Sequence, residues 1–301
     1  MKIAISGASG LVGKAVAERR ISLGDEVVAM KRDPEETRGG NGIFWSADLG
    51  LVDEVGLEGA DAVIHLAGES IAGPWTERRK EAIRESRVRG TLLISGAISH
   101  LRHRPRVLLV ASAVGVYGDR GDEILTEESA AGEGFLPEVC QEWEAAAEMA
   151  REAGIRVVHL RFGVVLAAGK GLLGRLVPIF RSGLGGRAGS GRQYISWVGL
   201  PDLVRAVDFC LENEGISGPV NVTSPNPVRN AEFATVLAKV LRRPAAVTMP
   251  ASVLRLTTGQ MAQEMILASA RAVPSRLTDA GFAFEEPELE EALRRILDSG
   301  I

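Results

Sequence analysis

The stretch KIAISGASGLVG, residues 2–13, decides the fold. Its apolar start, residues 2–6, predicts a buried strand, and the apolar spacing that follows as far as residue 24 predicts an amphipathic helix. Gly7, Gly10 and Gly13 lie at the junction. Between a strand and a helix, such glycines allow a tight turn, close approach of a phosphate to the backbone and close packing of helix on strand. Because the amides at a helix start attract anions, this stretch predicts a dinucleotide site.

Short apolar runs alternate with amphipathic stretches beyond this point, with strand-like runs at residues 26–30, 42–45, 60–68, 106–112 and 155–166. The alternation predicts a doubly wound α/β fold, in which a parallel sheet carries helices on both faces. We expect residues 1–165 to form a Rossmann domain and residues 200–222 to return to it. Residues 166–199 and 223–301 should form a smaller C-terminal substrate lobe. The Gly-rich run 169–193 inside that lobe is also typical of a flexible connection.

The composition is that of a soluble globular protein, with 301 residues, 46% hydrophobic and 25% charged residues. A formal net charge of -4 argues against a nucleic-acid partner. The chain begins with a strand instead of a signal sequence, and no apolar run is long enough to span a membrane, so we expect a cytoplasmic protein without a membrane partner. Its two cysteines form no C-x-x-C pair, and its four histidines are scattered, so no metal site is predicted.

The end of the second predicted strand indicates which dinucleotide binds. An NAD enzyme usually carries Asp or Glu there, but this chain carries Lys31 and Arg32. Arg can grip a phosphate with two hydrogen bonds while Lys adds a point charge, so the pair favours the 2'-phosphate of NADP(H). The alternative is a basic turn that faces water.

Several further segments resemble the extended branch of the short-chain dehydrogenase/reductase superfamily: SRVRGT at 86–91, SAVGVYG at 112–118 and ISWVGLPDLVRA at 195–206. HLAGESI, FLPEVCQEWEAAA and the ending VPSRLTDAGFAFEEPELEEAL resemble, more narrowly, an uncharacterised epimerase-like family with its own C-terminal domain. The resemblance covers nearly the whole chain. It implies an NAD(P)-binding fold and a small-molecule substrate such as a nucleotide sugar or a carbonyl compound, and it leaves the substrate and a homodimer open.

The phosphate loop and the resemblance together predict the cofactor contacts. Asp48 and Leu49 fall where the superfamily touches adenine, and Arg87 replaces the Asn of N-V-x-G-T, where it would hold phosphate or ribose or else be an exposed helix cation. The complete predicted set is Gly7, Ser9, Gly10, Leu11, Val12, Gly13, Lys31, Arg32, Asp48, Leu49, Leu66, Ala67, Gly68, Arg87, Gly163 and Val165.

The proton relay of the active relatives is absent at the positions that the resemblance assigns. Those relatives use a Tyr as proton donor, a Lys four residues later and a Ser or Thr that binds the reacting oxygen. Here Leu136 and Cys140 take the first two positions, and Ala113 takes the third, with Ser112 one place earlier and facing the other side of the strand. Between Val139 and Trp143, Cys140 is expected to be a buried, inert thiol.

The remaining catalytic candidates are Ser112, Tyr117 and Glu69, with Glu138 and Tyr194 behind them. Without a neighbouring Lys, Tyr117 should keep a pKa near 10, which makes it a hydrogen-bond donor or an aromatic packed under the lobe. Burial could raise the pKa of Glu69, or its side chain could cap the next segment. Two functions fit these residues: an NADP(H)-binding, epimerase-like oxidoreductase with a rearranged proton donor, and a catalytically silent NADP(H)-binding sensor or scaffold.

Overall fold

A computed structural model describes residues 1–40 and 42–298. Residues 41 and 299–301, which the predicted domain boundaries include, lie outside the described part. The main sheet has eight strands in the order β13-β8-β6-β5-β1-β2-β3-β4, all parallel except β4. Their bounds are β1 Lys2–Ser6, β2 Glu26–Lys31, β3 Ile43–Ser46, β4 Leu51–Val52, β5 Ala62–His65, β6 Val107–Ala113, β8 Arg156–Phe162 and β13 Gly218–Val222. The predicted doubly wound sheet is confirmed.

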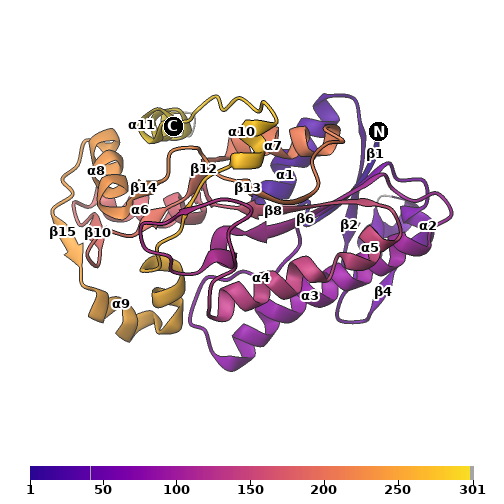
Figure 1. The fold of residues 1–301 in the computed structure, drawn as a ribbon, viewed down its shortest axis with the longest axis horizontal. Helices are drawn as coiled ribbons and strands as arrows, with labels where there is room; N and C mark the ends of the chain where they lie inside the picture. The colour runs from indigo at the N-terminus through magenta and orange to yellow at the C-terminus, as the bar shows by residue number, and fades with distance from the viewer. Residues whose placement is uncertain (41, 299–301) are drawn as a thin grey trace.

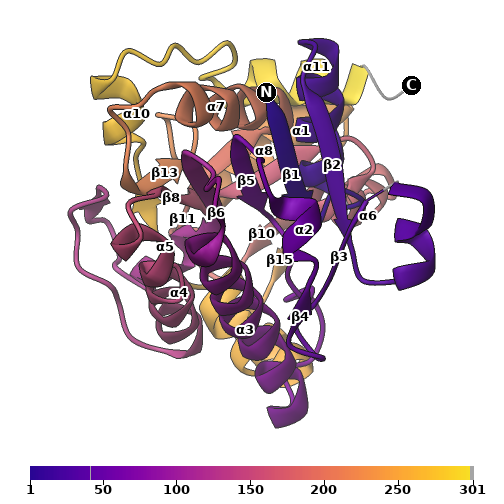
Figure 2. The same ribbon diagram turned by 90° about the vertical axis from the view of Figure 1, so that its right-hand side faces the viewer.

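Helices cover both faces of this sheet, as Figures 1 and 2 show. One face packs on α1 (Leu11–Ser22) and α7 (Leu200–Glu212) through Val16, Leu203 and Val207. The other packs on α3 (Glu77–His100), α4 (Phe135–Ala145) and α5 (Glu148–Glu152) through Ile94, Ile98, Trp143 and Ala150. The central strands are buried on both sides, which is why they are continuously apolar instead of alternating. Short helices α2 (Glu54–Leu57), η1 (Pro34–Gly40) and η2 (Val114–Tyr117) join these layers.

The C-terminal part has its own apolar cluster around Trp197, Phe180 and Phe233. Its helices are α6 Gly171–Arg181, α8 Asn230–Leu241, α9 Ala251–Thr258, the π-helix η3 Ala262–Ile266, α10 Ser275–Asp279 and α11 Leu289–Asp298. Short strands pair two by two: β7 Ile124–Leu125 with β16 Arg271–Ala272, β9 Val164–Ala167 with β12 Trp197–Gly199, β10 Gly186–Ala188 with β15 Val247–Met249, and β11 Tyr194–Ile195 with β14 Val228–Arg229. None of the described helices is long and apolar enough to cross a membrane.

Two local expectations need correction. The Gly-rich run 169–193 is more than a flexible connection, because it contains α6, whose Leu173 and Phe180 are buried in the C-terminal cluster. The strand-like run 155–166 forms two strands instead of one, since β8 pairs with β6 and β13 while β9 pairs with β12. In both places the tertiary partner, which local composition does not specify, determines the element.

Candidate functional site

The phosphate loop lies where the order of the main sheet reverses. The neighbours of β1 are β2 on one side and β5 on the other. Ligands of doubly wound proteins bind at such a switch point, beyond the carboxyl ends of the strands. Gly7 follows β1 with φ +72°, and a Cβ there would lie 2.9 Å from the amide nitrogen of Ala67, just after β5. A Cβ on Gly13 would lie 2.1 Å from the carbonyl oxygen of Gly7. Only glycine fits at either position.

The start of α1 is open to an anion. Gly10 precedes the helix, no side chain caps it, and no acidic residue lies in its first turn. Ser9 and Gly10 are exposed, while Leu11 is half-buried. Behind the loop, the half-buried side chains of Ala8, Val12, Leu66 and Val165 pack on the first core cluster. These contacts hold the start of α1 at the carboxyl edge of the sheet, the geometry that binds a pyrophosphate.

Lys31 and Arg32 end β2 at the same edge. The Lys31 ammonium donates to the carbonyl oxygen of Glu36 at 3.1 Å and lies 3.7 Å from that residue's carboxylate. Arg32 is exposed, and within residues 1–40 and 42–298 its guanidinium has no hydrogen-bond or ion-pair partner. Asp48 and Leu49 lie exposed in the turn after β3. The predicted adenosine end of the cofactor site therefore carries two cations. Arg32 has no partner among the described residues, and Lys31 is partly neutralised by Glu36.

Arg87 lies against the loop that follows β5. Its guanidinium donates to the carbonyl oxygens of Glu69 and Ile83, both at 3.0 Å, and lies 5.0 Å from the ring centroid of Trp143. A Cβ on Gly68 would lie 3.4 Å from its Cζ. Burial lowers the pKa of Arg87 from its ordinary value. The side chain is thus held beneath the predicted cofactor instead of extending freely into solvent.

A buried pair that we did not predict fixes the two strand ends beside the loop. The Ser6 hydroxyl lies 2.5 Å from Nδ1 of His65 and accepts the amide of Ala67 at 3.4 Å. Burial lowers the pKa of His65 to about 3, so the imidazole is neutral near pH 7. The sequence shows a His at the end of an apolar strand but gives no indication of its partner.

Leu136 and Cys140 occupy the positions that the resemblance assigns to the usual relay. A Cβ on Gly115 would lie 3.6 Å from Cβ of Leu136, so Leu136 faces the end of β6, as the replaced Tyr would. Burial raises the pKa of the Cys140 thiol to about 12, although Arg87 and Arg161 lie close enough to favour the thiolate. A buried, protonated thiol is a poor nucleophile.

Ser112, on β6, is hydrogen-bonded to a buried ion pair between Glu144 and Arg161. Its hydroxyl donates to Oε1 of Glu144 at 2.7 Å. Arg161 donates to both carboxylate oxygens of Glu144 at 2.8 Å. Burial alone would raise the pKa of Glu144, but the hydrogen bonds and charge of Arg161 outweigh it and hold that pKa below its usual value. The Ser112 hydroxyl is therefore occupied in a structural network.

Tyr117 lies beneath the C-terminal part, in a buried hydrogen-bond network. Its side chain is fully buried, and its hydroxyl lies 2.7 Å from Oδ1 of Asn221 and 3.0 Å from the carbonyl oxygen of Thr126, each able to accept its proton. The same oxygen accepts a hydrogen bond from Arg161 at 3.0 Å. Burial raises the pKa of Tyr117 above its usual value. The alternative of an aromatic packed under the C-terminal part fits these contacts and this burial.

The other candidates lie nearer the surface. Glu69 is half-buried after β5, and its carboxylate accepts a hydrogen bond from Arg79 at 2.8 Å. Glu138 is exposed and pairs with Arg84 at 3.3 Å. Tyr194 lies between two guanidinium groups, with Arg229 and Arg271 at 4.9 and 4.8 Å from its ring centroid. Of these, Glu69 lies nearest in the chain to the predicted cofactor loop.

The start of α4 receives a residue from the C-terminal part that we also did not predict. Gly134, the cap position, has no side chain to offer. The Glu264 carboxylate accepts the amide of Leu136 at 2.8 Å and that of Phe135 at 3.3 Å. A separation of 128 residues hides this contact from any local pattern.

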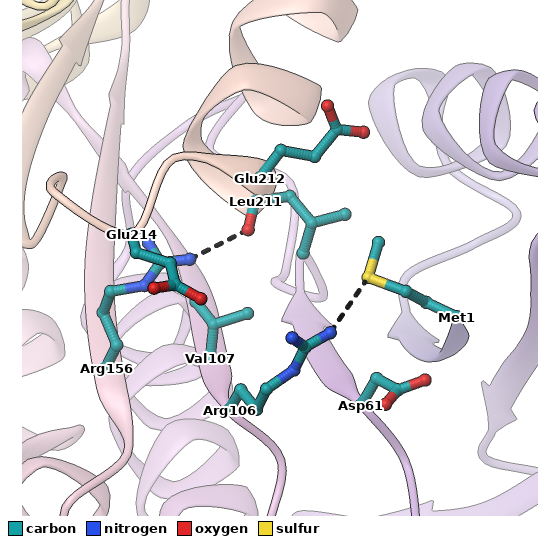
Figure 3. A pocket seen from close by; sticks show the side chains of 8 residues that line it. All are labelled: Met1, Asp61, Arg106, Val107, Arg156, Leu211, Glu212 and Glu214. Atoms are coloured by element: carbon teal, nitrogen blue, oxygen red, sulfur yellow. Dashed lines mark hydrogen bonds between the residues drawn. The ribbon is translucent and has the colours of Figure 1, made fainter.

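A hollow of about 390 Å³ at the opposite edge of the sheet is not the cofactor site. Figure 3 shows Met1, Asp61, Val107 and Arg156 around it, residues that precede or begin β1, β5, β6 and β8. It lies at the amino ends of these strands, away from Gly7. Acidic and basic side chains alternate around it, and its Arg156 is already bonded to the carbonyl oxygen of Leu211 at 2.8 Å.

Comparison with known proteins agrees with this geometry. The model of the NAD dependent epimerase/dehydratase family matches residues 3–223, and that of the domain of unknown function DUF1731 matches residues 249–296. Epimerase family protein Mb2239 of Mycobacterium bovis is 40% identical over 293 residues, which are 97% of this chain and 96% of the relative. Epimerase family protein YfhF of Bacillus subtilis is 35% identical, over 99% and 98% of the two chains.

The crystal structure of human epimerase family protein SDR39U1 (isoform 2) with NADPH superposes with a TM-score of 0.90. The two chains are 31% identical, and the match covers 99% of each. The fold, the phosphate loop, the matched family model and relatives of this identity and coverage lead to one conclusion: the chain belongs to the NAD dependent epimerase/dehydratase family.

Proposed function

We propose that this protein binds NADP(H) and acts as an epimerase-like oxidoreductase on a small molecule without the usual Ser/Thr-Tyr-Lys relay. The observation that carries the cofactor proposal is the edge formed by Gly7, Gly13 and Arg32: a backbone cradle that a Cβ would fill, next to an unpaired cation. The NADPH complex of the human relative supports it.

When bound, the cofactor supplies or accepts a hydride, and the chain's own residues do the rest. The amides at the start of α1 hold the pyrophosphate, and Lys31 with Arg32 holds the 2'-phosphate. Arg87, fixed by Glu69 and Trp143, presents its remaining donors to the ribose or phosphate of the nicotinamide half. Leu136 and Cys140 leave that half of the site apolar and poor in groups that carry a proton.

Glu69 is the candidate for the missing acid or base. It follows the predicted cofactor loop directly, and its carboxylate is half-buried and paired with Arg79. General acid–base catalysis contributes about a hundredfold to ten-thousandfold in rate. The reaction of an oxidoreductase that depends on this carboxylate would therefore fall by that order when the charge is removed.

One observation favours a second function. The hydroxyl groups of Ser112 and Tyr117 are both committed to buried hydrogen bonds, which suits an NADP(H)-binding sensor or scaffold without turnover. Both functions require the same cofactor site, so only a test for turnover distinguishes the oxidoreductase from the sensor or scaffold.

Titration calorimetry with NADPH and NADH tests the cofactor proposal. We expect NADPH to bind at least tenfold more tightly, because only NADPH carries the phosphate that Arg32 would contact. Equal affinity for NADPH and NADH would refute the cofactor proposal.

Stopped-flow measurement of NADPH oxidation with nucleotide sugars and carbonyl compounds tests the chemistry. Glu69→Gln should slow any turnover about a hundredfold or more, while Glu148→Gln, which removes an exposed carboxylate on α5, should leave it unchanged. Undisturbed turnover in the Glu69 variant would remove that residue from the mechanism, and NADPH binding without turnover of any compound would favour the sensor.

A further inference from the structure

Two segments of the C-terminal part are rich in basic residues. Residues 166–199 and 223–273 contain eleven Lys and Arg residues but only two acidic residues, Glu232 and Glu264. Besides a hydrogen bond from Gln260, one of these two carboxylates makes its contacts outside these segments. Glu264 reaches across to α4, where both its oxygens accept backbone amides, and a Cβ on Gly134 would lie 3.3 Å from it. A carboxylate at the amino end of a helix is stabilised both by the free amides and by the helix dipole.

The segment that leads to Glu264 has few other contacts. Helix α9 buries none of its side chains, and Leu256 is 87% exposed. All residues from 242 to 250 are exposed, including β15, whose one partner among the described strands is β10. Segments with few buried apolar contacts open at a low free-energy cost. Burial resumes only at Met261 and Ala262, immediately before Glu264.

A glycine separates α9 from this anchored end. Gly259 has φ +57° and ψ -134°, a conformation that residues with a side chain rarely adopt. No atom lies within 4 Å of the place where its Cβ would stand, so no neighbouring side chain packs against this turn. Beyond it, Gln260 donates to Glu264 at 2.7 Å and accepts from Lys80 of α3 at 3.4 Å. The contact with Lys80 joins this segment to α3.

We propose that residues 250–267 form a strap that Glu264 fastens to the first turn of α4, with Gly259 as its hinge. Glu264 is then a positioning residue: it fixes the backbone of Phe135 and Leu136 beside the end of β6 and ties down a segment that is otherwise weakly held. The consequence for ligands rests on the proposed function. If α4 borders the nicotinamide half, release of the strap uncovers that half of the site.

Hydrogen exchange in the ligand-free protein tests the strap directly. In Glu264→Ala we expect the amides of residues 251–258 and of Phe135 and Leu136 to exchange about tenfold faster than in the unaltered protein. Asp53→Ala is the matched control, because Asp53 is also a carboxylate that caps a helix, accepting the amide of Gly56 at 3.0 Å in α2. It should leave the exchange of residues 251–258 unchanged.

Unchanged exchange of residues 251–258 in Glu264→Ala would overturn the proposal, and so would faster exchange spread evenly over the whole chain, which would indicate a merely structural role. Glu264→Gln keeps one acceptor oxygen and most of the side chain's shape, so its amide exchange rates should lie between those of the unaltered protein and those of Glu264→Ala. If the Ala variant does not fold, the exchange of Glu264→Gln is measured in its place.

Release of NADPH, followed by its fluorescence after dilution, tests the consequence. We expect Glu264→Ala to release NADPH about tenfold faster and Asp53→Ala to release it at the unaltered rate; unaltered release from the Glu264 variant would refute the covering role. If the unaltered protein does not bind NADPH, the proposed function fails, whereas the exchange experiment still decides whether the strap exists.

Discussion

Replacement of Arg32 by alanine should separate cofactor binding from stability. Arg32 is exposed, and its guanidinium has no partner in residues 1–40 and 42–298, so its removal should change the free energy of unfolding by less than about 0.5 kcal/mol. A charge-assisted hydrogen bond to a phosphate contributes about 1.5–3 kcal/mol. The variant should therefore bind NADPH about 10- to 150-fold more weakly. Its affinity for NADH, which has no 2'-phosphate, should not change.

Titration calorimetry at low and at physiological ionic strength is the assay, because screening by salt should weaken the NADPH contact and leave NADH binding nearly unaffected. Arg102→Ala is the control: Arg102 is an exposed cation near the amino ends of the strands, far along the chain from the phosphate loop. A preference for NADPH that survives in the Arg32 variant would show that the 2'-phosphate does not lie at this residue.

Three further results follow from the geometry. Gly13→Ala should abolish binding of either cofactor in calorimetry, because its Cβ would collide with the carbonyl of Gly7 at 2.1 Å; retained affinity would contradict the loop assignment. Tyr117→Phe should lower the free energy of unfolding in urea by about 1–3 kcal/mol and leave NADPH affinity unchanged, because it leaves buried partners unsatisfied. Glu144→Ala should cost about 3–5 kcal/mol at pH 7, since it leaves Arg161 buried and unpaired. Because the pKa of Glu144 is lowered in the folded state, its stabilising contribution is complete above its usual pKa and is lost as the pH falls through the lowered value. Urea unfolding of Glu144→Gln should lack that acid-dependent loss.

The sheet and the phosphate loop could be predicted from the sequence because their signals are local. The strand, the three glycines and the helix at residues 2–24 are consecutive, and buried parallel strands are continuously apolar. A local pattern also predicted that Lys31 and Arg32 lie at the end of β2. The NADPH complex of the human relative agrees with the cofactor that those two residues predicted.

The candidate catalytic residues could not be judged locally. Tyr117 follows a strand at the ligand-facing edge, yet its hydroxyl is enclosed by Asn221 and Arg161, which lie 104 and 44 residues away. Nothing near Tyr117 in the chain encodes that enclosure. Glu264 was missed for the same reason, since its function depends on a helix start 128 residues earlier. The side-chain partners of such groups depend on tertiary packing, which a single sequence specifies only indirectly.

The buried hydrogen-bond network around Tyr117 also determines whether the protein can be shortened to the region that the first family model matches. Asn221 donates to the carbonyl oxygen of Val273 at 2.9 Å, and Leu277 lies fully buried in the same apolar cluster as β1 and α7. A chain shortened at residue 223, where the family model ends, would leave the Asn221 amide without that acceptor and open the cluster to water. The boundary between the two matched models is therefore not a boundary of cooperative unfolding, and the two regions should melt together in a single transition.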